Sequence, residues 1–178
     1  MPKKKVNSRG YSQRKVDTRE VKQTFLIVCE GEKTEPNYFK SFRVPTVVIE
    51  VKGLGENPSR LVESAKKWQK EDDYDQVWCV FDRDSWPEQD FYNAIKNATE
   101  QGFGVAYSHE CFELWYILHF EFLNVGIPRS DYMKKLNGLL GYKYQKNSET
   151  IYDELLNKQA AAIKNAENLL KGYNPPNP

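Results

Sequence analysis

Residues 25–39 read FLIVCEGEKTEPNYF. The apolar run at residues 25–29 is rich in β-branched residues and is typical of a strand buried on both faces of a parallel sheet. It ends abruptly at Glu30, whose carboxylate is costly to bury without a partner. Because ligands of open α/β sheets bind beyond the carboxyl ends of the strands, this position makes Glu30 a candidate site residue.

Strands and helices are predicted to alternate along the first two thirds of the chain. Further apolar runs at residues 44–51, 76–81 and 103–107 predict three more strands. Helical patterns fill the gaps between them, at residues 35–42, 58–70 and from about 88 to 102. This alternation predicts an α/β fold with a mostly parallel, four-stranded, Rossmann-like sheet flanked by helices.

The pattern becomes helical from Cys111 onward. We expect helices at residues 111–120, from about 130 to 140 and from about 150 to 170. In the last helix the residues expected to face inward are Ile151, Leu155, Ile163, Ala166 and Leu170. The predicted organisation is a flexible basic arm (1–22) and one domain (23–178), with an α/β core at about 23–110 and a helical part at about 111–172.

The composition indicates a folded protein of one domain. Of the 178 residues, 39% are hydrophobic and 13% aromatic, which excludes a disordered chain. The formal net charge of +1 conceals an asymmetry, because residues 1–22 carry +6 and the remainder therefore carries −5. Such a basic arm either contacts phosphates or only keeps the protein soluble, and both alternatives stay open.

The cysteines and the hydropathy favour a soluble cytoplasmic protein. Cys29, Cys79 and Cys111 lie in apolar segments without the C-x-x-C spacing of zinc sites, which is typical of reduced, buried thiols. No apolar run reaches membrane-spanning length, and no apolar segment follows the basic N-terminus as it would in a secretory signal. We therefore expect no membrane partner.

A second group of acids follows the third predicted strand. Asp82-Arg83-Asp84 comes directly after residues 76–81, as Glu30 comes after residues 25–29. If the strand order reverses between them, the three carboxylates meet at one crevice, where hard oxygen ligands suit Mg²⁺ or Mn²⁺. A cation there would polarise a phosphodiester and orient a water molecule. The alternative is that Asp82 and Asp84 only cap the next helix or form a turn.

These motifs carry a family resemblance. Glu30-Gly31 after one strand and Asp82-x-Asp84 after another resemble the Toprim fold of topoisomerases, primases and OLD nucleases. More closely, VCEGEKTEPNYF, VFDRD and CFELWYILHF within residues 24–178 are similar to the RloB family, which is associated with restriction-modification and abortive-infection phage defence in bacteria. The resemblance implies a Toprim-like core, a metal-dependent nuclease activity and a partner protein from a defence system.

The resemblance also implies roles for single residues. Glu30 matches the Toprim glutamate, a metal ligand or general acid/base, and Asp82 and Asp84 match the metal-binding pair. Glu35 falls where OLD-type nucleases place a second acid, so it is a further candidate metal ligand. The chain departs from the family at Ser108-His109-Glu110, where Ser-Asn-Pro is usual, and it stops at Pro178 where relatives continue. The role of that loop and the presence of a further C-terminal element stay open.

Several other charged residues have two interpretations each. Glu113 lies in an apolar run and needs a partner, either an arginine or a ligand at the site. Lys33 and Arg83 adjoin the candidate acids and either contact phosphate or remain solvated. The four tryptophans lie at core-like positions, which argues against a base-stacking platform. Contact with nucleic acid is also expected of six residues of the arm: Lys3, Lys4, Lys5, Arg9, Arg14 and Lys15.

The function that this pattern favours is hydrolysis of phosphodiester bonds in DNA or RNA, dependent on Mg²⁺ or Mn²⁺. Glu30, Asp82 and Asp84 would be the catalytic acids. One alternative is a non-catalytic adaptor on the same fold, which binds nucleic acid or a partner protein and uses its acids in turns and caps. Nucleotidyl transfer, as in primases, would use the same ligands and is a second alternative.

Overall fold

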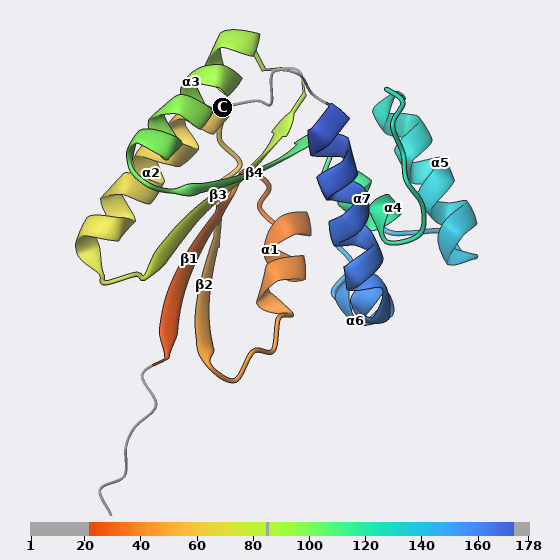
Figure 1. Cartoon of the computed structure of the whole chain (residues 1–178), viewed down its shortest axis with the longest axis horizontal. Coiled ribbons are helices and arrows are strands. Elements are labelled where there is room, and N and C mark those ends of the chain that lie inside the picture. Colours follow the sequence, from red (N-terminus) through yellow and green to blue (C-terminus); the bar gives the residue numbers. More distant parts are fainter. Residues whose placement is uncertain (1–21, 85, 173–178) are drawn as a thin grey trace, which may run out of the picture.

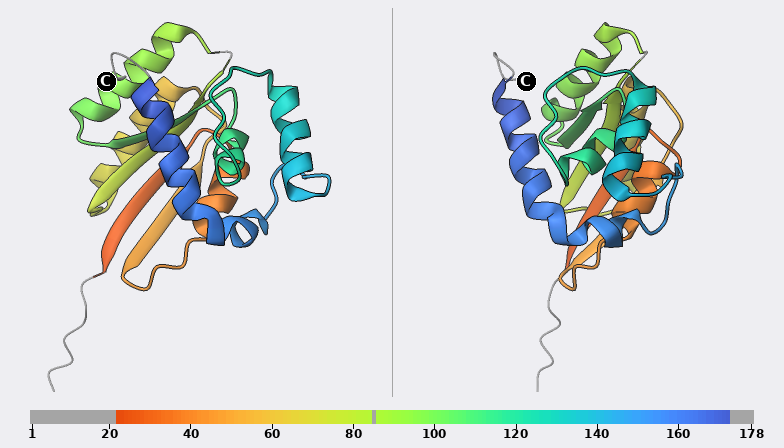
Figure 2. Two further views of the ribbon diagram at one scale, coloured as in Figure 1. Left: turned by 45° about the vertical axis from the view of Figure 1, so that its right-hand side comes forward. Right: turned by 90° about the vertical axis from the view of Figure 1, so that its right-hand side faces the viewer.

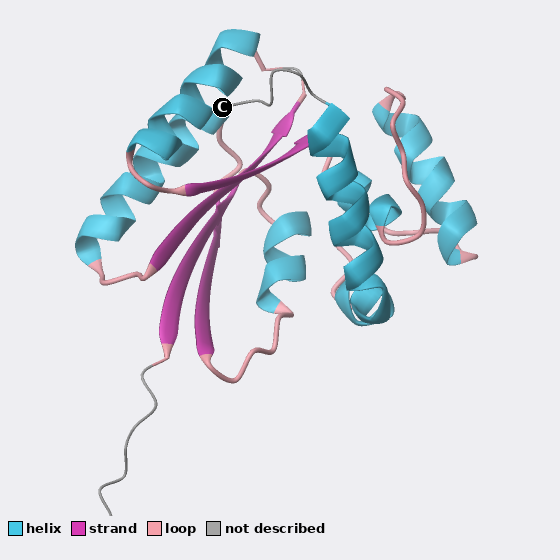
Figure 3. Ribbon diagram, viewed as in Figure 1, coloured by secondary structure: helices cyan, strands magenta, loops and turns pink. Residues whose placement is uncertain are grey.

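The chain forms a four-stranded parallel sheet with helices on both faces. The computed structural model describes residues 22–84 and 86–172. The strand order is β2-β1-β3-β4 and every strand pair is parallel, which confirms the predicted α/β fold (Figure 3). The strands are β1 (Gln23–Cys29), β2 (Val47–Gly53), β3 (Gln76–Arg83) and β4 (Gly104–His109).

Two helices cover one face of the sheet, and the remaining helices lie on the opposite side (Figure 1). On that side α4 contacts both α5 and α7 and lies between them (Figure 2). Over residues 22–84 and 86–172, no helix is long and apolar enough to cross a membrane. The helices are α1 (Thr34–Lys40), α2 (Pro58–Glu71), α3 (Glu88–Glu100), α4 (Glu113–Leu118), α5 (Arg129–Leu140), α6 (Ile151–Leu155), the 3₁₀ turn η1 (Leu156–Lys158) and α7 (Gln159–Gly172).

The sheet separates two hydrophobic cores. Successive side chains of a strand point to opposite faces, so Leu26 and Val28 of β1 pack against α2 and α3. Ile27 and Cys29 point the other way, into the core formed with α1 and the C-terminal helices. All four side chains are at most 7% exposed. This double burial explains why the strand is a continuous apolar run rather than an alternating one.

Helix α2 shows how local sequence sets the start of an element. The side chain of Asn57 accepts a hydrogen bond from the backbone N–H of Arg60 at 2.9 Å, and Pro58 follows in the first turn. Asparagine at the cap and proline at the first helical position are both preferred, because the cap satisfies an unpaired donor and proline lacks one. The start predicted at residue 58 is confirmed.

The long C-terminal helix is the element whose prediction is wrong. Residues 150–170 do not form one continuous helix, because η1 separates α6 from α7. The stripe that contacts the core therefore changes after η1, and α7 turns Ala162, Ala166 and Leu169 toward it. Ile163 and Leu170, which were expected to face inward, are 52% and 54% exposed.

The connections between strands place the carboxyl ends of β1 and β3 side by side. From β1 the chain crosses to the edge strand β2 and then returns past β1 to form β3 on its other side. At this end of the sheet Cys29 is in register with Val80, and the N–H of Glu30 donates to the Val80 carbonyl at 2.8 Å. Such a reversal of strand order opens a crevice in which ligands of α/β proteins bind.

Candidate functional site

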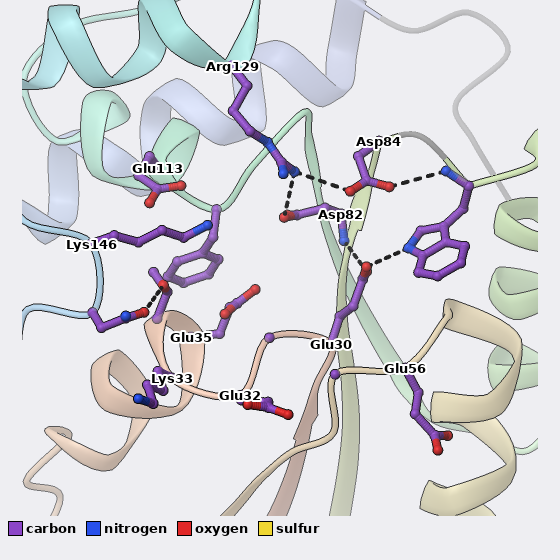
Figure 4. A pocket seen from close by; sticks show the side chains of 16 residues that line it. Glu30, Glu32, Lys33, Glu35, Glu56, Asp82, Asp84, Glu113, Arg129 and Lys146 are labelled. Carbon is purple, nitrogen blue, oxygen red and sulfur yellow. Dashed lines mark hydrogen bonds and ion pairs between the residues drawn. The ribbon is translucent and has the colours of Figure 1, made fainter.

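A cavity of about 390 Å³ lies at the carboxyl ends of β1 and β3. Its wall carries more acids than bases, and these come from both strand ends, from α1, α4 and α5, and from three loops (Figure 4). The acids are Glu30, Glu32, Glu35, Glu56, Asp82, Asp84 and Glu113, and the bases are Lys33, Arg129 and Lys146. The three acids that the sequence predicted to meet at one crevice therefore line a single cavity.

Glu30 is fixed by two hydrogen bonds, one to each carboxylate oxygen. Its Oε2 accepts the backbone N–H of Asp82 at 2.9 Å, and its Oε1 accepts the indole N–H of Trp86 at 2.7 Å. Burial raises the pKa of Glu30, and the two hydrogen bonds act in the opposite direction. The Glu30 carboxylate, directly after β1, is thus bonded by one oxygen to β3 and by the other to Trp86, which follows β3.

Asp82 and Asp84 each use one oxygen in a bond to the protein. Asp82 Oδ1 accepts the hydroxyl of Ser108 at 2.5 Å, and Asp84 Oδ1 accepts the backbone N–H of Trp86 at 3.2 Å. Ser108 lies in β4 directly opposite Asp82 in the parallel register. Burial, with the charges of Glu35 and Glu30, raises the pKa of Asp82 to about 7, although the Ser108 hydroxyl and Arg129 oppose this.

Arg129, the first residue of α5, reaches both aspartates. Its Nη2 lies 3.2 Å from Asp84 Oδ2 and 3.9 Å from Asp82 Oδ2. Its Nε donates to the backbone carbonyl of Glu110 at 2.9 Å. Two of the residues at positions 108–110 thus contact the site: Ser108 of β4 donates to Asp82, and the backbone carbonyl of Glu110 accepts from the arginine that faces Asp82.

Glu35 and Glu113 form a deeper acidic pair. Their exposed fractions are only 5% and 2%, and Glu113 Oε1 has no hydrogen-bond partner among the described residues. Burial and the charges of Glu113 and Glu30 raise the pKa of Glu35. The Glu35 carboxylate also lies against Gly31, where a β-carbon would overlap it, so a side chain at that position would force the Glu35 carboxylate to move. The partner expected for Glu113 was either an arginine or a ligand, and no described arginine forms a hydrogen bond with this oxygen.

A loop from the helical part closes the opposite wall of the cavity. The hydroxyl of Thr34 donates to the side chain of Asn147 at 3.0 Å, and the amide of Asn37 donates to its backbone carbonyl at 3.0 Å. These bonds hold the loop against α1 and bring Lys146 to the cavity. Asn147 has a φ of 71° and Glu110 a φ of 69°, and left-handed residues other than glycine are often found at functional sites.

The donor atoms suit a hard divalent cation, although the carboxylates of the cavity do not converge on one point. Carboxylate oxygens are the ligands that Mg²⁺ and Mn²⁺ prefer, and an unpaired oxygen as deeply buried as Glu113 Oε1 needs a partner. Within the described residues, however, no three Asp, Glu, His or Cys side chains are placed to share an ion. Their oxygens point instead to Trp86, Ser108 and Arg129.

Of the residues predicted to contact nucleic acid, one lines the cavity, one lies outside it, and six fall outside the described residues. Lys33 lines the cavity. Arg83 does not, because it lies on the opposite face of β3 from Asp82, where it pairs with Glu88 at 3.0 Å and lies over the ring of Phe91. The arm residues Lys3, Lys4, Lys5, Arg9, Arg14 and Lys15 lie outside the described residues.

Four residues of this region were missed in the sequence. Trp86 is 40% exposed and lines the cavity, so its assignment to the core was wrong, although its position two residues after Asp84 was a usable signal. Ser108 could have been found only from the register of β4 with β3. Arg129 and Lys146 lie far along the chain in loops or at a helix start, and no local pattern marks them.

Comparison with known protein families shows which family the chain belongs to. A family model described as RloB-like protein matches residues 25–178. The chain belongs to the RloB-like family. The match contains every residue that lines the cavity, so the candidate site lies wholly within the RloB-like region. No curated protein and no solved structure matches the chain.

Proposed function

We propose that this RloB-like protein is a nuclease that hydrolyses phosphodiester bonds in DNA or RNA with Mg²⁺ or Mn²⁺, and that it acts in bacterial phage defence. The observation that carries the proposal is the meeting of Glu30, Asp82 and Asp84 in one open cavity at the strand-order reversal. Ligand sites of α/β proteins lie at this place. The core would then serve as a Toprim-like scaffold.

Glu30, Asp82 and Asp84 would hold the cation, with Glu35 as a further ligand. When bound, such a cation supplies Lewis-acid polarisation of a phosphodiester and lowers the pKa of a water molecule. The protein contributes position and charge. Lys33 and Lys146 line the same cavity and would bind phosphate oxygens. Where Glu35 stays off the cation, the pKa that burial raises suits its carboxylate to take a proton from the attacking water instead.

The alternative is a non-catalytic adaptor on the same fold. The observation that favours it is the occupation of the carboxylate oxygens by protein donors, as a purely structural network would have. An adaptor should bind its nucleic acid or partner protein equally well in EDTA. A nuclease should bind Mn²⁺ with an affinity that Asp82 and Asp84 substitutions abolish.

The direct test is cleavage of DNA and RNA by the wild type, Glu30→Gln and Asp82→Ala in Mg²⁺ and in EDTA. We expect Mg²⁺-dependent cleavage by the wild type and a loss of at least about 100-fold in either variant, because each removes a ligand from the ion. Glu100→Gln, at the exposed end of α3, is the matched control and should cut at the wild-type rate.

Two outcomes would contradict the proposal. The first is folded Glu30→Gln and Asp82→Ala proteins that cut as fast as the wild type. The second is a wild type that cuts neither DNA nor RNA in Mg²⁺ or Mn²⁺ while it binds nucleic acid in EDTA, which would establish the adaptor. Product analysis with nucleotides supplied distinguishes hydrolysis from nucleotidyl transfer. Phage plating on cells that express the wild type or Asp82→Ala tests the defence role.

A further inference from the structure

The guanidinium of Arg129 lies on the oxygens that remain for a cation. Asp82 Oδ1 is taken by the Ser108 hydroxyl and Asp84 Oδ1 by the backbone N–H of Trp86. The Oδ2 atoms are left, and Nη2 of Arg129 lies 3.2 Å from that of Asp84 and 3.9 Å from that of Asp82. Arg129 therefore covers the same pair of atoms that a divalent cation would bind.

The backbone of Glu110 holds Arg129 in this position. Its carbonyl accepts hydrogen bonds from both Nε and Nη2 of the guanidinium. Glu110 has a φ of 69°, a left-handed conformation that is unfavourable for a residue with a β-carbon, and its N–H donates to the Arg83 carbonyl at 3.0 Å. A strained residue that turns its carbonyl toward an arginine at the site indicates that this contact has a role.

The contact with the aspartates can nevertheless be broken. The Arg129 side chain is 47% exposed, and it meets Asp84 through one nitrogen rather than through a bidentate pair. A partly exposed, single-contact ion pair of this kind is weak. Arg129 can therefore leave the aspartates without unfolding its surroundings.

We propose that Arg129 is a displaceable counter-cation. This rests on the proposed function: Arg129 neutralises Asp82 and Asp84 until a divalent cation takes their Oδ2 atoms, and the released guanidinium then binds a phosphate of the nucleic acid. Two positive charges repel each other at this distance, so the cation and the guanidinium exclude each other from the two oxygens. The planar fork of guanidinium N–H donors matches a phosphate, so the released side chain has a new partner.

Two consequences follow from this exchange. First, it accounts for the dispersed arrangement of the described acids, which do not gather around one point while Arg129 occupies Asp82 and Asp84. Second, cation binding and phosphate binding assist each other. The cation frees Arg129 for the phosphate, and the phosphate draws Arg129 away from the cation's ligands. By linkage each must tighten the other by the same factor.

The test is a Mn²⁺ titration, followed by electron paramagnetic resonance of the free ion. We expect Arg129→Ala to bind Mn²⁺ roughly tenfold more tightly than the wild type, because the competing charge is removed. Arg129→Gln keeps a donor for the Glu110 carbonyl without the charge, so it should also bind Mn²⁺ more tightly than the wild type. It replaces Arg129→Ala in the titration if that variant does not fold. Arg60→Ala is the matched control: Arg60 is an exposed arginine of α2 that does not line the cavity, so the Mn²⁺ affinity of this variant should equal that of the wild type.

The coupling is tested with a ten-nucleotide single strand, in one series DNA and in another RNA. In the wild type the oligonucleotide should lower the Mn²⁺ dissociation constant several-fold, and in Arg129→Gln this effect should be lost. Mn²⁺ affinities that are equal or weaker in folded Arg129 variants would overturn the inference. The proposed function is judged separately in the same titration: equal Mn²⁺ binding by the wild type and Asp82→Asn would count against it, whatever the Arg129 variants do.

Discussion

At the scale of single residues, the candidate site is held by hydrogen bonds between strand ends. Trp86 is the side chain that best shows this, because its indole N–H donates to Glu30 and its backbone N–H donates to Asp84. Charge-assisted bonds of this type are among the stronger ones in proteins. A residue that is not itself acidic, Trp86, therefore helps to orient the acidic side chains of the site.

Replacing Trp86 by Phe should weaken catalysis without unfolding the protein. The indole bond to Glu30 lowers the pKa of that carboxyl, so its loss raises the pKa, and the acid limb of the cleavage–pH profile should move to higher pH. The maximal rate should fall by about tenfold, the size expected for one hydrogen bond to a charged group. Trp78→Phe is the control, because the Trp78 indole bonds to Gln76 away from the cavity. A Trp86→Phe profile that superimposes on that of Trp78→Phe would contradict this role.

Asp82 should make the metal-free protein less stable as the pH rises. Its pKa of about 7 in the folded protein lies above the ordinary 3.8, so the folded state binds this proton more tightly than the unfolded state. The stabilisation is fully present below about pH 4 and is lost as the pH rises through about 7. The difference between the two pKa values corresponds to at most about 4 kcal/mol.

Urea unfolding in EDTA between pH 4 and 8 measures this dependence. The free energy of unfolding of the wild type should fall over this range, and Asp82→Asn should fall less steeply. Some slope should remain in the variant, because the pKa values of Glu30 and Glu35 are raised as well. Asp73→Asn, at an exposed position, should keep the wild-type slope. Parallel curves for wild type and Asp82→Asn would show that Asp82 is not the group that titrates.

At the scale of secondary structure elements, the strands and most helices could be predicted because each has a local signal. Continuous runs of apolar residues indicated β1 and β3, and Asn57-Pro58 indicated the start of α2. The break between α6 and α7 falls at Asn157-Lys158-Gln159, where polar residues interrupt the apolar period between Leu155 and Ala162. Because residues on both sides of it are helical in character, this interruption was not recognised as a helix end.

The residues of the candidate site likewise divide into those with a local sequence signal and those without one. Glu30, Asp82 and Asp84 could be predicted because they follow buried strands, and in parallel sheets such positions gather at one edge. Arg83 lies outside the cavity because alternation along β3 turns it to the face opposite Asp82, and its predicted phosphate contact stays a prediction. Ser108, Arg129 and Lys146 could not be predicted, because each reaches the cavity through long-range packing.

The turn between β1 and α1 should be intolerant of a side chain at Gly31. A β-carbon there would overlap the carboxylate of Glu35, which is too buried to move aside freely. We expect Gly31→Ala to fold but to bind Mn²⁺ at least about tenfold more weakly, because Glu35 is pushed out of the site. Gly138→Ala, in α5 with open space around it, is the control and should be more stable by about 0.5–1 kcal/mol. Unchanged Mn²⁺ affinity in Gly31→Ala would remove Glu35 from the set of ligands.

At the scale of the whole molecule, the charge is divided between a basic N-terminal segment and an acidic remainder. Removal of residues 1–21 deletes seven Lys/Arg residues against two acids. If the segment contacts the phosphate backbone, its removal should weaken nucleic-acid binding and flatten the slope of log K against log salt, by about 0.7–0.9 for each lost phosphate contact. Fluorescence anisotropy at several salt concentrations measures this. An unchanged slope would assign the segment to solubility alone.

We propose that Glu30, Asp82 and Asp84 share a divalent cation. A crystal structure of the wild type soaked in Mn²⁺, with anomalous diffraction measured at the manganese edge, tests it most directly. We predict an anomalous peak in the cavity with carboxylate oxygens of these residues at about 2.1 Å, and the Arg129 guanidinium turned away from Asp82 and Asp84. A cavity without an anomalous peak, with Arg129 still on both aspartates at saturating Mn²⁺, would show that the three acids do not share a cation.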